Sequence, residues 1–269
     1  MAGLLVLFLP GIQSDSTMEL SKVDAIPDIK QTDKRFGFPE KGLAFCAPVA
    51  VLDSFSWLSK NGYKIILPEV SKEVDPETGA CRKLAELMET RPGLGTTTEQ
   101  FLTGIKRYIE TSTPYKIQSL KYEGWNRHSP EYDNAQPCPD LKWIKEGIRD
   151  KRSEWINIGW YKIDPATKTL ERQQGHWVTL VGYGIGLDGA ADPNTLIVRD
   201  PSPVLSKEPR KIFITVEPLK EGKLTGAHEG LPRDAAGYLF IKSMGNGVDS
   251  SGNRTGVIDG AIVLELDRP

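Results

Sequence analysis

The sequence lacks several features that would assign it at once to a class of protein. Its three cysteines contain no Cys-x-x-Cys pair, which argues against a structural zinc site. Its 34 basic and 36 acidic residues nearly balance, and no long run of one charge sign suggests a surface for nucleic acid. Neither a phosphate-binding loop nor a dinucleotide fingerprint is present. We therefore expect no metal, no other cofactor and no nucleic-acid partner.

The sequence also has no apolar run of about 20 residues, the length that a helix needs to cross a bilayer. A shorter apolar stretch, Ala2–Leu9, is followed by Pro10-Gly11 and by the small residues Ser14 and Ser16. This order is typical of the apolar core and cleavage region of a secretory signal. We interpret residues 1–16 as a signal segment and expect a secreted or cell-envelope protein without an integral membrane segment. A cytoplasmic location is the alternative.

The few cysteines bear on the same question of location. If the chain is exported, its three cysteines can form one disulfide, which leaves one thiol over. Cys81 and Cys138 both lie in loop-like sequence, so we expect them to pair and to leave Cys46 as the free thiol. In the cytoplasm all three would stay reduced.

Helical patterns dominate the first half of the 269 residues. Apolar residues at spacings of two to four indicate a buried helix that begins at Cys46, continues to Lys60 and stops at Asn61-Gly62. A capping box of Thr96 and Glu99 predicts the start of another helix. Shorter helices are expected at 83–89 and about 141–150, and one strand at 115–122.

Strand patterns dominate the second half. Short β-branched or aromatic runs bounded by turn residues predict strands at 155–163, 175–184, 195–198, 211–216, 238–242 and 261–266. Helices followed by strands indicate an α+β protein. We expect one domain over 17–269, with a helical lobe at about 17–150 and an antiparallel β lobe at about 151–269.

Three residues have settings that favour chemistry. Cys46 starts a helix, where the macrodipole and unpaired N–H groups favour the nucleophilic thiolate. His176 stands at the mouth of an apolar strand, where a base can reach both a nucleophile and solvent. Asp200 ends the following strand and can accept the other N–H of the histidine. The chain order Cys, His, Asp is typical of cysteine enzymes whose His and acid lie far downstream.

Several blocks of sequence resemble the papain-like cysteine peptidases, and most closely their C39-like branch. The similar blocks are Ile26–Asp33 (IPDIKQTD), Cys46–Ala50 (CAPVA), Gly95–Ile109, His176–Tyr183 (HWVTLVGY) and Val198–Pro201 (VRDP). The resemblance implies a papain-like fold, in which a helical lobe carrying the Cys helix packs on an antiparallel β lobe carrying His176 and Asp200. It also implies that Gln31 supplies the side chain of the oxyanion hole, together with the backbone N–H of Cys46.

The resemblance predicts a hydrolase, specifically a cysteine peptidase or thiol protease with the catalytic triad Cys46, His176 and Asp200. Its substrate would be a peptide or protein, and we expect a monomer. Two alternatives stay open. A transglutaminase-like acyl transferase uses a similar triad, and an inactive peptide-binding module is consistent with Ala47, which stands where the family usually has glycine.

Overall fold

The computed structural model describes residues 18–69, 71–202, 211–226, 231–245 and 254–267, so the predicted signal segment 1–16 lies outside the described residues. Four α-helices occur in these ranges: α1 (Cys46–Lys60), α2 (Pro76–Leu87), α3 (Thr98–Ser112) and α4 (Leu141–Gly147). Short 3₁₀ helices lie at Lys34–Phe36, Pro39–Gly42, Lys64–Ile66 and Pro130–Tyr132. The strands are β1 (Ile117–Gly124), β2 (Ser153–Asp164), β3 (Thr169–Ile185), β4 (Ala191–Arg199), β5 (Ile212–Pro218), β6 (Lys223–Thr225), β7 (Arg233–Asp234), β8 (Leu239–Gly245) and β9 (Arg254–Leu266).

The helices follow from local sequence. The predicted helix from Cys46 to Lys60 is confirmed as α1, with Asn61 as its C-cap. Helix α2 begins at Pro76 rather than at residue 83, because the side chain of Asp75 accepts a hydrogen bond from the backbone N–H of Thr78 and caps the helix there. The capping box of α3 is formed by Thr97 and Gln100, one residue later than predicted.

The strands do not form a separate antiparallel lobe beside a helical lobe. Strands β2, β3, β4, β5, β8 and β9 pair in that order, all antiparallel, and β9 pairs back with β2, so that they close a six-stranded barrel. Strand β1 extends the sheet beyond β9, and β6 and β7 extend it beyond β3. The predicted papain-like fold is therefore wrong.

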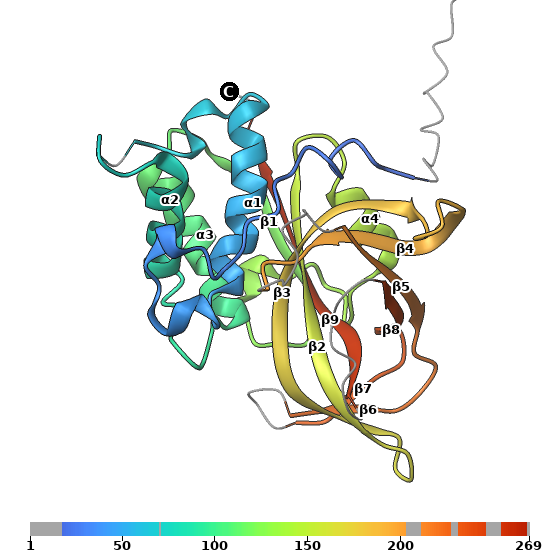
Figure 1. The fold of residues 1–269 in the computed structure, drawn as a ribbon. Coiled ribbons are helices and arrows are strands. Elements are labelled where there is room, and N and C mark those ends of the chain that lie inside the picture. The colour runs from blue at the N-terminus through green and yellow to red at the C-terminus, as the bar shows by residue number, and fades with distance from the viewer. Residues whose placement is uncertain (1–17, 70, 203–210, 227–230, 246–253, 268–269) are drawn as a thin grey trace, which may run out of the picture.

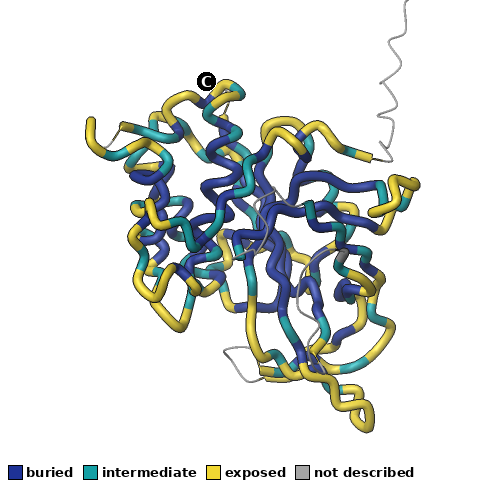
Figure 2. Tube along the Cα trace, viewed as in Figure 1, coloured by how far each residue is buried: buried dark blue, intermediate teal, exposed yellow. Residues whose placement is uncertain are grey.

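The physical reason is that barrel closure leaves no local signal. The pairing that closes the barrel joins β2 to β9, for example Ser153 to Leu264, and alternation within either strand does not identify its partner. Helix α1 lies between the strands and the pair α2–α3, and it packs on β3 and β2 (Figure 1). Buried residues concentrate along α1 and the middle of the strands, whereas the β2–β3 hairpin tip is exposed (Figure 2). The domain limits predicted from sequence stay a prediction.

Candidate active site

Cys46 is the first residue of α1 and is half-buried. No acidic residue lies in the first turn of the helix, and Phe45 at the N-cap makes no side-chain capping bond. The positive end of the helix dipole therefore acts on the thiol without a nearby carboxylate from that turn. Pro48 has no N–H, which leaves the backbone N–H groups of Cys46 and Ala47 as the donors at the start of the helix.

The chain approaches Cys46 through a tight turn that presses against Gln31. Glu40 and Lys41 both have positive φ values, 49° and 56°, and Gly42 follows at 78°. A Cβ at residue 42 would lie 1.9 Å from the backbone oxygen of Gln31, so only glycine fits. One residue on, the carbonyl of Leu43 accepts a hydrogen bond from Gln31 Nε2 at 2.7 Å. Gln31 is thus held beside the loop that leads into the candidate nucleophile.

His176 and Asp200 come together because β3 and β4 are antiparallel. The register pairs Thr179 with Arg199, so the chain after β4 runs back beside His176. His176 Nε2 donates to Asp200 Oδ1 at 2.6 Å, since an ionised carboxylate can only accept. Both side chains are mostly buried, with 15% and 8% of their surface exposed. Nε2 is committed to Asp200, which leaves Nδ1 for the thiol.

The electrostatics join Cys46 to this pair. Burial opposes ionisation of the thiol, but the hydrogen bond and positive charge of His176, with a backbone hydrogen bond from Trp177, outweigh it and lower the pKa of Cys46. Burial likewise opposes protonation of the ring, but the charge of Asp200 and the bonds to Asp200 and Cys46 raise the pKa of His176 to about 10. These opposite shifts favour a thiolate–imidazolium pair, the reactive state of a cysteine nucleophile.

Helix α1 is anchored on the strands one turn after Cys46. The backbone carbonyl of Ala50 accepts hydrogen bonds from Thr179 Oγ1 at 2.7 Å and from Trp155 Nε1 at 3.0 Å. Trp177, next to His176, packs on Phe101 of α3 with ring centroids 4.4 Å apart. These buried contacts fix the distance between the helix that carries the thiol and the strand that carries the histidine.

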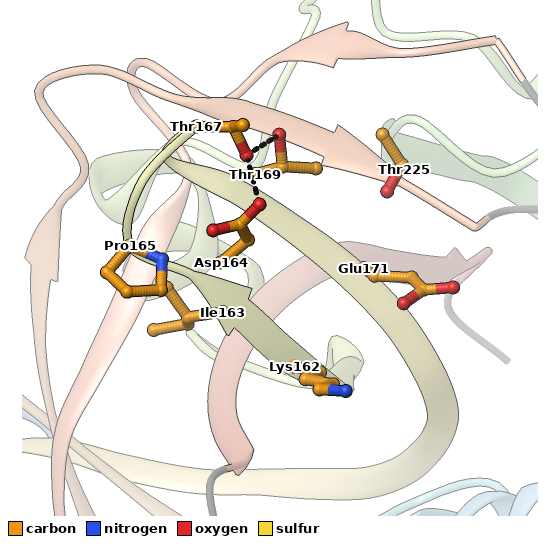
Figure 3. Close-up of a pocket in the computed structure, with 8 residues that line it drawn as sticks. All are labelled: Lys162, Ile163, Asp164, Pro165, Thr167, Thr169, Glu171 and Thr225. Carbon is orange, nitrogen blue, oxygen red and sulfur yellow. Dashed lines mark hydrogen bonds between the residues drawn. The ribbon is translucent and has the colours of Figure 1, made fainter.

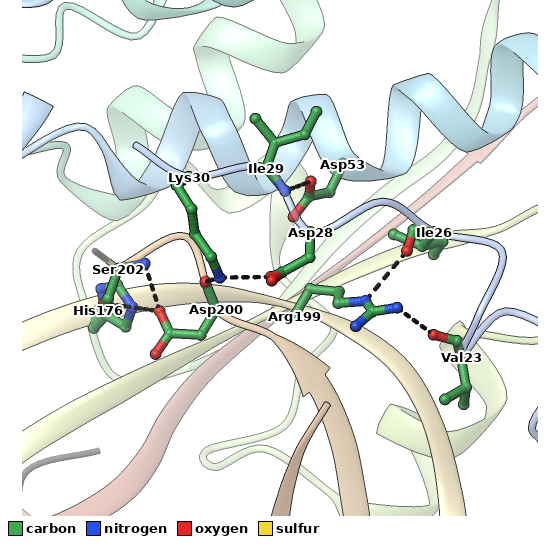
Figure 4. Close-up of polar contacts among 10 residues, drawn as sticks. All are labelled: Val23, Ile26, Asp28, Ile29, Lys30, Asp53, His176, Arg199, Asp200 and Ser202. Carbon is green, nitrogen blue, oxygen red and sulfur yellow. Dashed lines mark hydrogen bonds and ion pairs between the residues drawn. The ribbon is translucent and has the colours of Figure 1, made fainter. Parts of the chain in front are cut away.

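The segment Ile26–Asp33 ties α1 to the end of β4 (Figure 4). The backbone N–H of Ile29 donates to Asp53 Oδ1 of α1 at 3.0 Å. Lys30 Nζ donates to the backbone oxygen of Asp200 at 2.7 Å, and the N–H of Gln31 donates to the oxygen of Pro201 at 2.8 Å. The four blocks that contain Gln31, Cys46, His176 and Asp200 therefore meet at one place.

Gln31 lies beside the loop that leads to Cys46, and its amide already has a partner in that loop. Nε2 carries two hydrogens, so the bond to Leu43 leaves one for a substrate oxygen. The residue is only 3% exposed, and its Oε1 has no hydrogen-bond partner among the described residues. Whether Gln31 acts on the oxyanion stays a prediction.

The predicted disulfide between Cys81 and Cys138 is wrong. All three cysteines are free thiols. Cys81 is buried in the cluster formed by α1, α2 and α3, whereas Cys138 packs on a different cluster beside Tyr161 and Tyr238. The error arose because α2 begins before Cys81, which places this thiol in the helical core instead of a loop. Burial raises the pKa of both thiols, in contrast to Cys46.

Ser202 is a site residue that the sequence did not reveal. Its hydroxyl lies 3.0 Å from His176 Nε2, and its backbone N–H donates to Asp200 Oδ1 at 2.8 Å. A serine two residues after an Asp-Pro step is also a common turn residue, so the local pattern does not single it out.

A groove of about 540 Å³ lies elsewhere, at the tip of the β2–β3 hairpin (Figure 3). Its lining residues are Lys162, Ile163, Asp164, Pro165, Thr167, Thr169, Glu171 and Thr225. None of them belongs to the candidate triad, and the walls are mostly exposed, so we assign the groove no part in the chemistry.

In comparisons with known proteins, neither a family model nor a curated protein matches this chain. The resemblance to C39-like peptidases thus stays a prediction that rests on short blocks of sequence. Over the part of the chain that the structure describes, no helix is long and apolar enough to cross a membrane.

Proposed function

We propose that this chain is a cysteine hydrolase, specifically a peptidase, that cleaves peptide or related amide bonds through a thioester on Cys46. The supporting observation is the 2.6 Å hydrogen bond between His176 Nε2 and Asp200 Oδ1, made by the same ring that lowers the pKa of Cys46. This arrangement gives a nucleophile, a base and an orienting group with distinct roles.

The chemistry follows from those roles. The Cys46 thiolate attacks the carbonyl carbon, a C–S bond forms, and the oxyanion is met by the N–H groups at the start of α1 and by Gln31. The His176 imidazolium gives its Nδ1 proton to the leaving amine, and the C–N bond breaks. His176 then takes a proton from water, whose oxygen attacks the thioester and releases the acid and the thiolate. Asp200 holds the ring in one orientation throughout.

The first test is thiol labelling, which needs no substrate. At about pH 6, below the usual thiol pKa of about 8.5, iodoacetamide should label Cys46 in the native wild-type protein and label it far more slowly in His176→Ala. Cys81 and Cys138 are internal controls, because burial raises their pKa values. Equal labelling of Cys46 in the two proteins would count against an activated thiol.

A second candidate is a peptide-binding module without turnover. It is favoured by one observation, that the Gln31 amide already donates to Leu43 and so is partly withdrawn from an oxyanion. This module would bind peptides saturably in Cys46→Ser and release no product in the wild type. A peptide fragment whose formation depends on Cys46 would exclude it.

A further inference from the structure

Ser202 makes two contacts with the His176–Asp200 pair (Figure 4). Its Oγ lies 3.0 Å from His176 Nε2, and its backbone N–H donates to Asp200 Oδ1 at 2.8 Å. The Ser202 side chain also helps to lower the pKa of Asp200. A single half-buried residue therefore contacts both partners of the ion pair on the side away from the thiol.

The geometry excludes Ser202 as a second nucleophile. A serine nucleophile needs a ring nitrogen with a free lone pair to accept its proton. His176 Nε2 carries the hydrogen that it donates to Asp200 Oδ1, so it cannot accept one from Ser202. The Ser202 oxygen instead accepts a share of the Nε2 hydrogen, while its own hydrogen is free to point at the carboxylate.

The turn that carries Ser202 is held on both preceding residues. Lys30 Nζ donates to the backbone oxygen of Asp200, and the backbone N–H of Gln31 donates to the backbone oxygen of Pro201. Lys30 is itself paired with Asp28 at 2.7 Å. These bonds hold the backbone just before residue 202 and so keep Ser202 beside the pair.

We propose that Ser202 is a positioning residue of the site, whose hydroxyl bridges His176 Nε2 and Asp200 and holds the imidazolium in the orientation that faces Cys46. The inference rests on the proposed function, because it assigns a role within that reaction.

The direction of its effect follows from which charged states the hydroxyl stabilises. An oxygen that accepts from Nε2–H stabilises the imidazolium, and a hydroxyl that donates to Asp200 stabilises the carboxylate. Among the described residues, the other charged or titratable groups that contact the pair are Cys46 from α1 and Lys30 from the Ile26–Asp33 segment, and a substitution at residue 202 changes neither. Without the hydroxyl the imidazolium is less stable relative to the neutral ring. The Cys46 thiolate, which the positive charge of the ring stabilises, then forms only at higher pH.

The test measures the rate of Cys46 alkylation by iodoacetamide against pH in wild type, Ser202→Ala and Ser202→Thr, with the modified peptide identified by mass spectrometry. We expect Ser202→Ala to raise the pH of half-maximal rate by about half to one unit, the size of one typical hydrogen bond in a protein. Ser202→Thr keeps the hydroxyl and should follow the wild type. Ser202→Gly also lacks the hydroxyl and replaces the alanine variant if that protein does not fold.

Superimposed profiles for wild type and Ser202→Ala would overturn the proposal, as would a Thr variant that behaves like Ala. Hydrolysis of a peptide library by the wild type is measured in parallel. A shifted alkylation profile without hydrolysis would reject the proposed function and keep the positioning role. Hydrolysis by the wild type with an unshifted profile in Ser202→Ala would reject the positioning role of Ser202 and keep the proposed function.

Discussion

Proton positions in the candidate site follow from the hydrogen bonds of single side chains. His176 commits Nε2 to Asp200, so the proton that it exchanges in the proposed reaction is the one on Nδ1. Burial opposes ionisation of Asp200, but the charge and hydrogen bond of His176 and the bonds from Ser202 hold its pKa well below its usual range. The carboxylate therefore stays ionised, which fits the orienting role that we propose for it.

A single substitution of Gln31 tests its predicted role as an oxyanion donor. If its second Nε2 hydrogen meets the oxyanion, Gln31→Ala should lower kcat/KM for a peptide by about 10²–10³, because that donor is needed only in the transition state. The alkylation rate of Cys46 should not change, since it requires no oxyanion. Gln173→Ala is the matched control, because Gln173 is exposed and, among the described residues, its amide donates to the carbonyl of Glu171. A parallel fall in alkylation would mean that Gln31 only supports the loop at Leu43.

The first turns of helix α3 support β3, the strand that carries His176. Phe101 packs on Trp177, and the helix begins with a reciprocal capping box in which Thr97 Oγ1 accepts from Gln100 N–H and Gln100 Oε1 accepts from Thr97 N–H. Removing the Thr97 hydroxyl leaves an N–H at this helix start without its partner.

Thr97→Ala should therefore lower the free energy of unfolding by about 1 kcal/mol, measured by urea denaturation with an unchanged m-value. Thr111→Ala is the control within the same helix. Its hydroxyl donates to the carbonyl of Arg107 on the exposed surface, and surface substitutions usually change stability by less than about 0.5 kcal/mol. Equal effects of the two substitutions would contradict the capping role.

The accuracy of prediction at this scale depends on how local each signal is. Helix α1 was predicted from its apolar spacing and its Asn61 stop, all within one stretch of chain. The predicted capping box, Thr96 with Glu99, is one residue away from the observed pair. Three threonines precede Glu99 and Gln100, so adjacent pairs fit the same sequence pattern. The main strands were located, but the short β6 (Lys223–Thr225) and β7 (Arg233–Asp234) carry too few residues for alternation to reveal them.

At the scale of the whole molecule, the candidate site was easier to predict than the fold. Cys46, His176 and Asp200 were chosen from helix and strand ends, and the structure brings them together. Closure of the barrel depends on pairing between strands about a hundred residues apart, which no local pattern encodes. Ser202 was missed for a related reason, because its role exists only once β3 and β4 lie side by side.

A buried polar network crosses the three neighbouring strands at which the barrel closes. Asp259 of β9 accepts hydrogen bonds at Oδ2 from Arg172 Nε of β3 at 2.6 Å and from Tyr161 OH of β2 at 2.8 Å. Arg172 Nη2 also donates to Asn157 Oδ1 at 2.8 Å. Asp259 is fully buried and Arg172 is 14% exposed, so neither charge has much water to replace a lost partner.

Asp259→Asn should therefore lower the free energy of unfolding by about 3–5 kcal/mol at neutral pH, because it leaves the Arg172 charge buried without its counter-ion. The matched control is Glu217→Gln in the pair Lys242–Glu217, which joins β5 and β8 of the same barrel with both side chains about half exposed. Exposed pairs contribute at most about 1 kcal/mol, so this variant should unfold close to the wild-type urea midpoint. Similar losses in the two variants would mean that the network is not what stabilises closure. A large loss confined to Asp259→Asn would show that the network joining β3, β2 and β9 stabilises the closed barrel. One of these strands, β3, also carries His176.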